Sequence, residues 1–377
     1  MWQPGMSRSV SLIKNNSAFS ARLLAWHKRH GRHDLPWQGT RDAYRIWVAE
    51  IMLQQTQVVA VIPYYRRFLE RFPDIATLAG APQDEVLRLW SGLGYYSRAR
   101  NLQRAAQLVQ ERHGGMFPRA LEKIEALPGI GRSTAAAIAA FAYGTRAAIL
   151  DGNVKRVLSR HFAVGGFPGE KRIENRLWQL ADEHLPSRFI GRYTQAMMDL
   201  GATLCTRAKP ACAGCPLATS CRALALGRVR EFPAPRPAKA VPTRATHMLL
   251  LVRNGEVLLE KRPPSGIWGG LWSLPELADD GRVHVHCRAN YGCSIATPQP
   301  LAPLAHGFTH FKLQIQPLLC RVEKLAPVAR EAGQMWLSLE QAHGAAIPIP
   351  VRKLLERLLS QSCRWSRGRG RSTAAGA

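Results

Sequence analysis

The chain has 377 residues, 46% of them hydrophobic, which is enough for two or three domains with buried cores. Lys and Arg outnumber Asp and Glu by 52 to 26, which favours a polyanionic partner, nucleic acid ahead of a membrane surface; a basic, solvated surface is the plainer interpretation. No apolar run approaches the length of a membrane span, and the first residues lack the apolar core of a signal peptide, so we expect an intracellular protein.

Residues 17–226 have a helical hydrophobic period, as the stretch 42–72 illustrates. Glu50 lies in this stretch beside Trp47 and Ile51, on a strongly apolar face. An acid in such surroundings is costly unless it is neutral or paired, and burial raises its pKa toward the range that suits a general acid. On the local sequence alone, a structural carboxylate with satisfied hydrogen bonds is an equally good interpretation.

The stretch LPGIGRSTAAAIAA, residues 127–140, interrupts an apolar helix with one Pro and two Gly. We expect a short helix over 120–127, a second helix from Arg132 to Tyr143, and a hairpin between them. Glycines permit positive φ and leave N–H groups uncovered, so such a hairpin at a helix N-terminus can bind a phosphate. A plain turn between helices is the alternative, and the basic charge of the chain favours the contact with DNA.

Asp151 stands directly before the helical stretch GNVKRVLSR. Its simplest role is that of a helix N-cap, whose side chain accepts a hydrogen bond from a backbone N–H of the first turn. Paired with Glu50, it would also suit cleavage of an N-glycosidic bond. In that reaction one acid protonates the departing base while one carboxylate stabilises the oxocarbenium-like sugar.

Four of the eight cysteines crowd into one short segment: Cys205, Cys212, Cys215 and Cys221. In a reducing compartment such a cluster indicates a metal site rather than disulfides. Four thiolates can hold either Zn²⁺ or an iron–sulfur cluster. The six-residue first gap is long for a zinc knuckle and favours iron–sulfur, with zinc still open on chemistry alone.

The pattern changes after residue 226. Residues 227–245 are rich in Pro and Arg and predict an extended linker. Residues 246–361 predict an α+β domain with a hairpin at Asn254-Gly255, an alternating strand from Phe311, and a closing helix near 351–359. Residues 362–377 form a basic tail that we expect to be disordered.

Several of these motifs resemble a known family. LPGIGRSTA resembles the helix-hairpin-helix of the endonuclease III superfamily of DNA glycosylases, and ILDGNVKRV follows at the spacing where that superfamily carries its catalytic Asp. VAEIMLQQTQV (48–58), GLGYYSRARNL (92–102) and QAMMDLGATLCT (195–206) resemble the adenine-specific branch, the MutY glycosylases. The resemblance runs from about Ala18 to Leu359.

The resemblance implies a multidomain fold: an all-α helix-hairpin-helix glycosylase domain with a [4Fe–4S] cluster on the four cysteines, and an α+β Nudix-like domain. It also implies an adenine DNA glycosylase, a hydrolase of base excision repair that acts on adenine opposite 8-oxoguanine or guanine and leaves an abasic site. Glu50 would be the acid at adenine N7 and Asp151 the oxocarbenium stabiliser or nucleophile. Asn153 and Ser133 would support the sugar and the water.

Ser133 stands where endonuclease III-type enzymes carry a Lys. A Lys amine forms a Schiff base with the sugar and goes on to cut the strand, whereas a Ser hydroxyl cannot. We therefore expect a monofunctional glycosylase. Some members of the family carry Tyr at this position, so the resemblance does not define the role of the Ser133 hydroxyl.

The resemblance assigns further residues to base and DNA recognition. Adenine flipped out of the duplex would enter a pocket formed by Trp37, Gln38, Leu53, Val58 and Gln195. Gln55 and Tyr95 would enter the base stack, although a polar helix face and a core aromatic are the plainer interpretations. Further DNA contacts are expected from Gln54, Thr56, Leu127, Pro128, Gly129, Ile130, Gly131, Arg156, Arg207 and Lys209.

The stretch PPSGIWGGLWSLPE resembles the entry to a Nudix fold, and Gly270 and Glu276 match the first part of the Nudix box. Farther on, His284-Val285 and Arg288-Ala289 stand where that box requires carboxylates, so we expect no Mg²⁺-dependent pyrophosphatase site. In the MutY family this domain recognises 8-oxoguanine, and its Phe-Ser-His loop appears here as Phe308, Thr309 and His310. The start of an ordinary strand is the plainer interpretation of that stretch.

Three other functions stay open on the sequence: an endonuclease III-like lyase, a Nudix hydrolase that binds DNA, and a non-catalytic iron–sulfur DNA-binding protein. Ser133 argues against the first and the broken Nudix box against the second, while the third would need neither Glu50 nor Asp151. We expect a cytoplasmic, nucleoid-associated monomer that binds double-stranded DNA and no membrane. Downstream repair proteins are possible partners through the linker.

Overall fold

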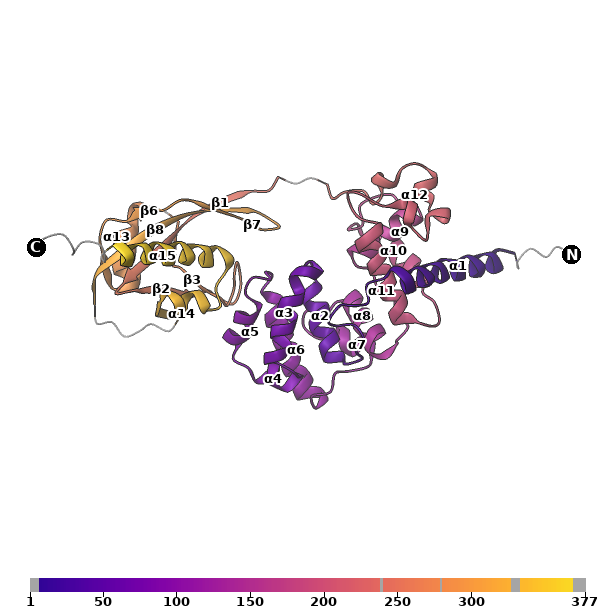
Figure 1. Ribbon diagram of the computed structural model, residues 1–377, viewed down its shortest axis with the longest axis horizontal. Helices are drawn as coiled ribbons and strands as arrows, with labels where there is room; N and C mark the ends of the chain where they lie inside the picture. Colours follow the sequence, from indigo (N-terminus) through magenta and orange to yellow (C-terminus); the bar gives the residue numbers. More distant parts are fainter. Residues whose placement is uncertain (1–6, 238–239, 279, 327–332, 369–377) are drawn as a thin grey trace, which may run out of the picture. The chain divides into compact units, whose positions relative to one another are not determined.

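The computed structural model of the chain describes residues 7–237, 240–278, 280–326 and 333–368 (Figure 1). It divides into two compact units, and we describe each by itself. Unit 1 comprises Met1–Gly80 with Asn101–Ala238, and unit 2 comprises Ala81–Arg100 with Lys239–Ala377. Unit 1 thus ends inside the linker expected over 227–245, whereas the grouping of Ala81–Arg100 with the C-terminal residues was not expected.

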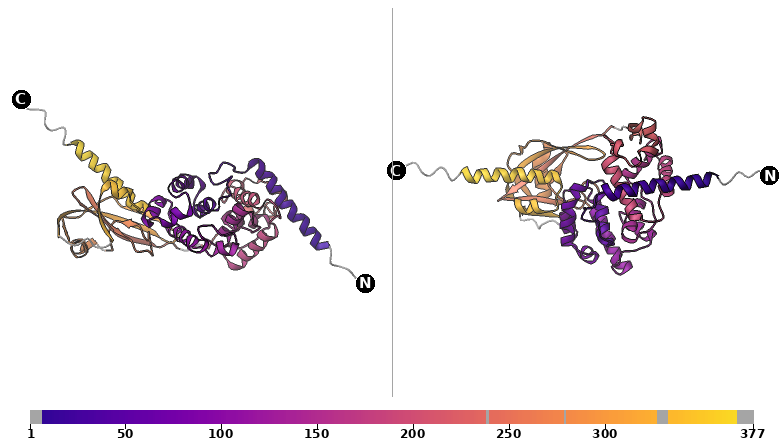
Figure 2. Two further views of the ribbon diagram at one scale, coloured as in Figure 1. Left: turned by 90° about the horizontal axis from the view of Figure 1, so that it is seen from below. Right: turned by 45° about the vertical axis from the view of Figure 1, so that its right-hand side comes forward.

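Unit 1 is built from helices, as its hydrophobic period predicts. They are α1 (Ser7–His30), α2 (Ala43–Leu53), α3 (Val58–Arg71), α4 (Ile75–Gly80), most of α6 (Ser97–His113), α7 (Leu121–Glu125), α8 (Arg132–Tyr143), α9 (Gly152–His161), α10 (Lys171–Glu183), α11 (Ile190–Asp199) and α12 (Arg222–Ala225). The N-terminal part of α1 runs clear of the other helices of this unit (Figure 2). No described helix is long and apolar enough to cross a membrane.

The core of unit 1 places α2 against α8. Asp42 caps α2 by accepting hydrogen bonds from the backbone N–H groups of Tyr44 and Arg45. The facing helix, α8, buries an unbroken run of small side chains, Ala135–Ala137 and Ala139–Ala140, around Ile138. Because alanine adds little bulk, α2 and α8 pack closely together.

A second core cluster in unit 1 joins α1 and α8 to the helices that follow. Phe19, Leu23 and Trp26 of α1 pack with Val154, Val157 and Leu158 of α9, Leu177 and Leu180 of α10, and Ala196, Met197 and Leu200 at the end of α11. The start of α9 and the end of α11, which carry several of the expected site residues, therefore belong to one buried assembly.

Unit 2 contains α5 (Gln83–Trp90) and a nine-stranded mixed sheet with helices. The strands are β1 (Thr243–Arg253), β2 (Glu256–Lys261), β3 (Trp272–Ser273), β4 (Glu276–Leu277), β5 (Cys293–Ile295), β6 (Gln299–Pro300), β7 (Leu304–Gly307), β8 (Lys312–Leu325) and β9 (Gln334–Ser338). The central pair, β1 and β8, is parallel, and the other pairings are antiparallel.

The predicted hairpin at Asn254-Gly255 joins β1 to β2, and both turn residues have positive φ, as a two-residue hairpin turn requires. β8 alternates from buried Leu313 to buried Ile315, as its sequence indicates. Helices α13 (Val283–Tyr291), α14 (Leu339–Gly344) and α15 (Ile349–Gly368) complete the unit. The expected fold class, a helical domain followed by an α+β domain, is confirmed.

We expected residues 362–377 to be disordered. The prediction is wrong for residues 362–368, because α15 continues to Gly368. Val351, Leu354, Leu355 and Leu358 are all buried and give the start of this helix an apolar face, and α14 packs beside the helix. Residues 369–377 of the expected tail lie outside the described residues, as do 238 and 239 of the linker.

Candidate active site

Glu50 lies near the C-terminal end of α2, one residue before the buried Ile51 and Met52. Its side chain keeps some exposed surface, yet it is deep enough that burial raises its pKa from 4.5 to about 8, with the charge of Asp151 adding to the rise. A group with this pKa holds its proton at neutral pH, which is the state that a general acid needs.

Asp151 is the N-cap of α9, which confirms the role expected from its position before a helical stretch. Its Oδ1 accepts the backbone N–H of Val154 at 2.8 Å, and its Oδ2 accepts the Nδ2 amide of Asn153 at 2.9 Å. Burial raises the pKa of Asp151, while these hydrogen bonds favour the carboxylate and oppose the rise. The cap therefore fixes a carboxylate within electrostatic reach of Glu50.

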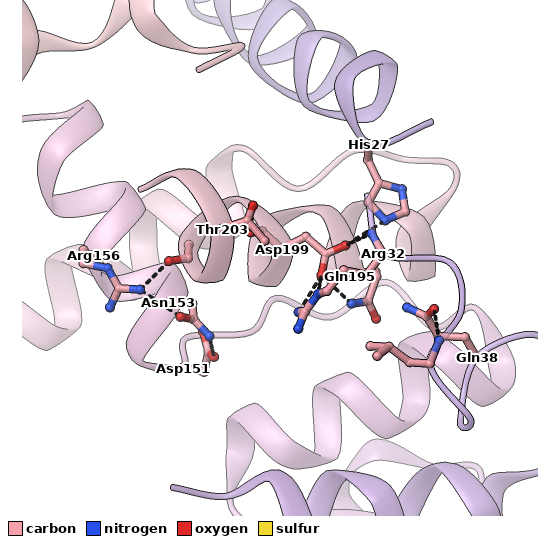
Figure 3. A network of polar contacts seen from close by, with 11 residues as sticks. His27, Arg32, Gln38, Asp151, Asn153, Arg156, Gln195, Asp199 and Thr203 are labelled. Atoms are coloured by element: carbon pink, nitrogen blue, oxygen red, sulfur yellow. Dashed lines mark hydrogen bonds and ion pairs between the residues drawn. The ribbon is translucent and has the colours of Figure 1, made fainter. Parts of the chain in front are cut away.

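Asn153 and Arg156 continue the contacts of Asp151 toward the cysteine loop (Figure 3). The guanidinium of Arg156 donates to Asn153 Oδ1 at 2.8 Å and to the carbonyl oxygen of Cys205 at 2.6 Å. It also donates to the carbonyl oxygen of Gly201. A side chain would not fit at Gly201, because its Cβ would lie 2.5 Å from Asn153 Cβ. Arg156, which we expect to contact DNA, also ties α9 to the segment before Cys205 through these hydrogen bonds.

Ser133 lies in the first turn of α8 and faces the segment that leads to Asp151. Its Oγ accepts the backbone N–H of Leu150 at 2.9 Å. Ser133 stands where endonuclease III-type enzymes carry a Lys. Its hydroxyl binds Leu150, the residue directly before the candidate catalytic carboxylate of Asp151.

Gln195 of the expected adenine pocket donates from Nε2 to Asp199 Oδ1 at 2.8 Å (Figure 3). Asp199 is fully buried and also binds Arg32, whose backbone N–H donates at 2.8 Å and whose Nη2 lies 2.6 Å away; His27 Nε2 lies 3.3 Å away. Burial acts to raise the pKa of Asp199, but the hydrogen bonds and the charge of Arg32 outweigh it and lower the pKa.

The network around Asp199 was not expected from the sequence. A signal was present, since Asp199 interrupts the apolar run Ala196–Leu200 in the way that Glu50 interrupts its helix. His27 and Arg32 carry no such signal, because they lie at the end of α1 and just after it, far away in the sequence.

The other expected pocket residues lie at the ends of helices or between them. Trp37 is buried and meets Tyr65 edge to face at 5.4 Å between ring centres. Gln38 accepts the backbone N–H of Leu35 through Oε1 at 3.3 Å. Leu53 ends α2 and Val58 begins α3, and both are half-buried.

The helix-hairpin-helix forms as expected, with the second helix from Arg132 to Tyr143 and the first slightly shorter than expected, Leu121–Glu125. Gly129 has φ +80°, and a Cβ there would lie 2.9 Å from Asn101 Cβ. Ile130 and Leu127 are buried beneath the hairpin, so we expect these two residues to contact DNA through their backbone. Pro128 and Gly131 complete the corner, and Gly131 precedes the first turn of α8.

Gln54 links the end of α2 to this hairpin. Its Nε2 donates to the carbonyl oxygen of Gly129 and to Thr134 Oγ1, both at 3.3 Å. The next residue, Gln55, is exposed and has φ +56°, which is rare for a residue other than glycine. Thr56 Oγ1 donates to the carbonyl of Gln54 at 3.3 Å. The turn after α2 therefore presents Gln55 from a strained, anchored backbone.

The four cysteines lie in a loop of short turns after α11, and each is partly exposed. Burial, with the nearby Cys205, Cys221 and Cys212 thiols adding to it, raises the pKa of Cys215 to about 11. Arg160 organises the loop: its guanidinium lies 3.4 Å from Cys205 Sγ and donates to the carbonyl of Thr206 at 2.7 Å.

These thiols fit a metal centre, because ligands that raise one another's pKa are stabilised as thiolates by a positive charge between them. Among the described residues, no three His, Cys, Asp or Glu side chains converge to hold a single ion. In a [4Fe–4S] cluster each Cys thiolate binds a different iron, so the four sulfur atoms do not have to converge on one point. Arg207 and Lys209 are exposed between the first two cysteines, and Lys209 lines a surface cavity of about 560 Å³ with Arg228 and Arg230.

Unit 2 holds the remaining expected residues. Thr309 and His310 are exposed at the turn between β7 and β8, and Phe308 beside them is half-buried. Tyr95, in the same unit, is exposed with φ +49°, and its hydroxyl lies 2.9 Å from the Thr309 hydroxyl. The carboxylate of Glu276, the one residue of the Nudix box retained here as an acid, pairs with Arg262 at 2.9 Å.

Comparison with known proteins gives the class and then the family. A model described as "HhH-GPD superfamily base excision DNA repair protein" matches residues 48–183, and one described as "NUDIX domain" matches residues 247–357. The protein is thus a helix-hairpin-helix base excision repair protein with a Nudix-like domain. Among solved structures, "a thermostable thymine-DNA glycosylase" matches with a TM-score of 0.52 and 30% identity, over 56% of this chain and 98% of that chain.

The chain is 36% identical to the adenine DNA glycosylase of Buchnera aphidicola subsp. Acyrthosiphon pisum, over 90% of this chain and 97% of that protein. It is 35% identical to the adenine DNA glycosylase of Homo sapiens, over 90% of this chain and 73% of that protein. The chain therefore belongs to the adenine DNA glycosylase (MutY) family, the DNA N-glycosylases of base excision repair. The family expected from the sequence is confirmed.

Proposed function

We propose that this chain hydrolyses the N-glycosidic bond of adenine mispaired with 8-oxoguanine or guanine in double-stranded DNA, and leaves an abasic site. The observation that carries the proposal is the pair formed by Glu50 and Asp151, in which one carboxyl group keeps its proton at neutral pH while the other is held by hydrogen-bond donors that favour its ionised form. Acid-assisted glycosidic cleavage uses one protonated carboxyl group and one carboxylate, the roles we give to Glu50 and Asp151.

Glu50 is the general acid in this mechanism. With a pKa of about 8, it is protonated at neutral pH and can give its proton to N7 of an adenine that has left the base stack. Protonation lets the base depart as a neutral molecule. The low-polarity surroundings of α2 that raise the pKa also strengthen the attraction between the developing charges.

Asp151 stabilises the positive charge that develops on the sugar. Its two oxygens are oriented by the Val154 N–H and the Asn153 amide, so the carboxylate faces the reaction without rotating. Its negative charge also contributes to keeping Glu50 protonated. After the base has departed, water attacks the anomeric carbon and loses one proton to the solvent, which gives the abasic site.

The flipped adenine would be bound by the pocket residues Trp37, Gln38, Leu53, Val58 and Gln195. Asp199 fixes the orientation of Gln195 by accepting from its amide nitrogen, which leaves the Gln195 carbonyl oxygen able to accept from an exocyclic amine. Arg32 neutralises the buried charge of Asp199, so the network adds no net charge beside the base.

The product is an abasic site rather than a cut strand, because Ser133 carries no amine with which to form a Schiff base. Its hydroxyl binds the backbone before Asp151. The absence of an amine at Ser133 argues against an endonuclease III-like lyase, which was one of the alternative functions left open by the sequence.

Cys205, Cys212, Cys215 and Cys221 would hold a [4Fe–4S] cluster, whose contribution is to fix the fold of their loop. The loop would then present Arg207 and Lys209 to DNA phosphates, together with the backbone N–H groups of the Gly129–Gly131 corner. In unit 2, Phe308, Thr309 and His310 would read 8-oxoguanine opposite the adenine. Thr309 keeps the hydroxyl of the family's Ser and adds a methyl group to the surface that would meet the lesion.

A labelled duplex with adenine opposite 8-oxoguanine tests the proposal, with and without hot alkali. We expect strand cleavage at the adenine that depends on alkali and is lost in Glu50→Gln, while exposed Glu111→Gln retains it. Cleavage without alkali would instead indicate a lyase. Absence of cleavage in both conditions, or full activity in Glu50→Gln, would refute the proposed chemistry.

A further inference from the structure

The turn that carries Thr309 and His310 is short and closed. β7 and β8 pair up to Gly307 and Lys312, and the backbone N–H of Phe308 donates to the carbonyl of Phe311 at 2.9 Å. Only the four residues 308–311 lie between the strands, and the two in the middle are exposed. Figure 1 shows this hairpin at the end of the sheet, where β7 is labelled.

Aromatic rings support this turn from one side. Phe308 stacks on Phe311 with 4.5 Å between ring centres, and His306 meets Phe308 nearly edge-on at 4.7 Å. Trp268, from the loop between β2 and β3, lies 5.6 Å from Phe308 and 5.9 Å from His306. Arg244 of β1 covers the ring of Phe311 at 4.7 Å. The side chains flanking the exposed pair are therefore packed against groups from three other parts of the domain.

Trp268 reaches this position through an unusual backbone. Its φ is +55°, a region that costs free energy for a residue with a side chain and persists only when the surroundings hold it. The loop around it is tight, because Arg262 N–H bonds to the Leu271 carbonyl at 2.8 Å and a Cβ on Gly269 would lie 2.4 Å from the Pro264 carbonyl oxygen. Trp268 is buried, with only 7% of its surface exposed. The strained backbone therefore places a large buried ring beside Phe308.

We propose that Trp268 is a positioning residue for lesion recognition: it holds Phe308, and through it the exposed Thr309 and His310, in the geometry that contacts 8-oxoguanine. The inference rests on the proposed role of this turn as the 8-oxoguanine reader. A turn that is already ordered loses little conformational entropy on binding, so removing the supporting ring should weaken binding of the lesion. It should leave the chemistry at Glu50 and Asp151 unchanged.

The test compares single-turnover adenine release from duplexes with 8-oxoguanine or guanine opposite the adenine. Trp268→Ala should lower the preference for the 8-oxoguanine duplex by roughly five- to twenty-fold, with the guanine duplex changed less than twofold. Trp268→Phe, which keeps a ring, should retain most of the preference. Val285→Ala, at an exposed position of the same domain, is the matched control and should behave as the parent. Amide hydrogen exchange of residues 308–311 should be faster than in the parent for Trp268→Ala, but not for Trp268→Phe or Val285→Ala.

The outcomes separate this inference from the proposed function. If the parent protein shows no preference for 8-oxoguanine, the reading role of the turn fails. If the parent prefers 8-oxoguanine and Trp268→Ala keeps that preference, or if both duplexes slow equally, only the role of Trp268 is overturned. Should Trp268→Ala melt far below the parent, His306→Ala removes a ring from the same stack, and the same loss of preference is then required of it.

Discussion

The Nδ2 amide of Asn153 donates a 2.9 Å hydrogen bond to Oδ2 of Asp151, and the Oδ1 of the same amide accepts from Arg156 at 2.8 Å. The Arg156 contact fixes which end of the amide faces the carboxylate, so Asn153 can only donate to Asp151. These hydrogen bonds favour the carboxylate form of Asp151 and oppose the rise in its pKa that burial causes.

Asn153→Ala should therefore impair catalysis more than binding. Without the amide, Asp151 loses one of its orienting donors and its pKa should rise further, because the lost hydrogen bond favoured the carboxylate. We expect the rate of adenine release to fall by about 10- to 100-fold, with less than a threefold change in affinity for the duplex. Asn175→Ala, at an exposed position of α10, is the control; equal losses in the two variants would contradict the role given to Asn153.

The rate of adenine release should depend on pH through Glu50. Since its pKa is about 8, the acid form predominates below that value and is lost above it, so the single-turnover rate should decline on the alkaline side with a midpoint near pH 8. Measurement between pH 6 and 9.5 checks this. A rate that stays level to pH 9.5 would show that another group supplies the proton.

The stability of the protein should also depend on pH through Glu50, with a defined sign. Below pH 4.5 folded and unfolded chains both hold the proton; between pH 4.5 and about 8 the unfolded chain releases it while the folded chain does not. The folded state therefore loses stability as pH rises through this window, on the order of 2 to 4 kcal/mol by pH 8. Glu50→Gln should melt higher than the parent at pH 8 and nearly equal to it at pH 4.5. A melting temperature gap that does not change with pH would contradict this.

Arg156→Gln tests whether the position of the cysteine loop affects catalysis. The guanidinium binds both the Cys205 carbonyl and Asn153, so its loss frees the loop from α9 and frees the amide that orients Asp151. We expect the rate of adenine release to fall by about tenfold or more. Arg172→Gln, an exposed site on α10, removes the same charge and should only weaken DNA binding slightly. If the two variants lose the same activity, the effect of Arg156 is only one of net charge.

Cys215→Ser should remove the metal centre. The purified parent should carry close to four irons per chain and absorb in the visible range, and the variant should lose both, because a Ser hydroxyl is a poor ligand for iron in such a cluster. Cys320→Ala removes a buried thiol of unit 2 and should leave the iron content unchanged. Zinc in place of iron in the parent protein would overturn the cofactor assignment.

Features with local causes could be predicted from the sequence. The helix from Arg132 to Tyr143 follows from the glycine corner, the hairpin at Asn254-Gly255 from its turn residues, and the capping role of Asp151 from its place before a helical run. The apolar face around Glu50 indicated a raised pKa, because burial acts on an acid whatever its distant partners are.

Features with distant causes could not be predicted. Asp199 meets Arg32 across 167 residues of sequence, and neither residue alone indicates the other. The resemblance assigns Arg156 to DNA contacts, but its bonds to the backbone carbonyls of Cys205 and Gly201 have no sequence signature. The support of the Phe308–Phe311 turn by Trp268 likewise depends on a left-handed backbone that a tryptophan rarely adopts.

The alanine run of α8 has a consequence for variation in this protein. The small buried side chains of this helix let α2 approach closely, and Ile138 is the one large aliphatic side chain buried among them. A single added methyl or ethyl group at the fully buried Ala139 would force its neighbours to move. Such a substitution would look conservative in a sequence comparison, and we expect it to lower the melting temperature through packing alone.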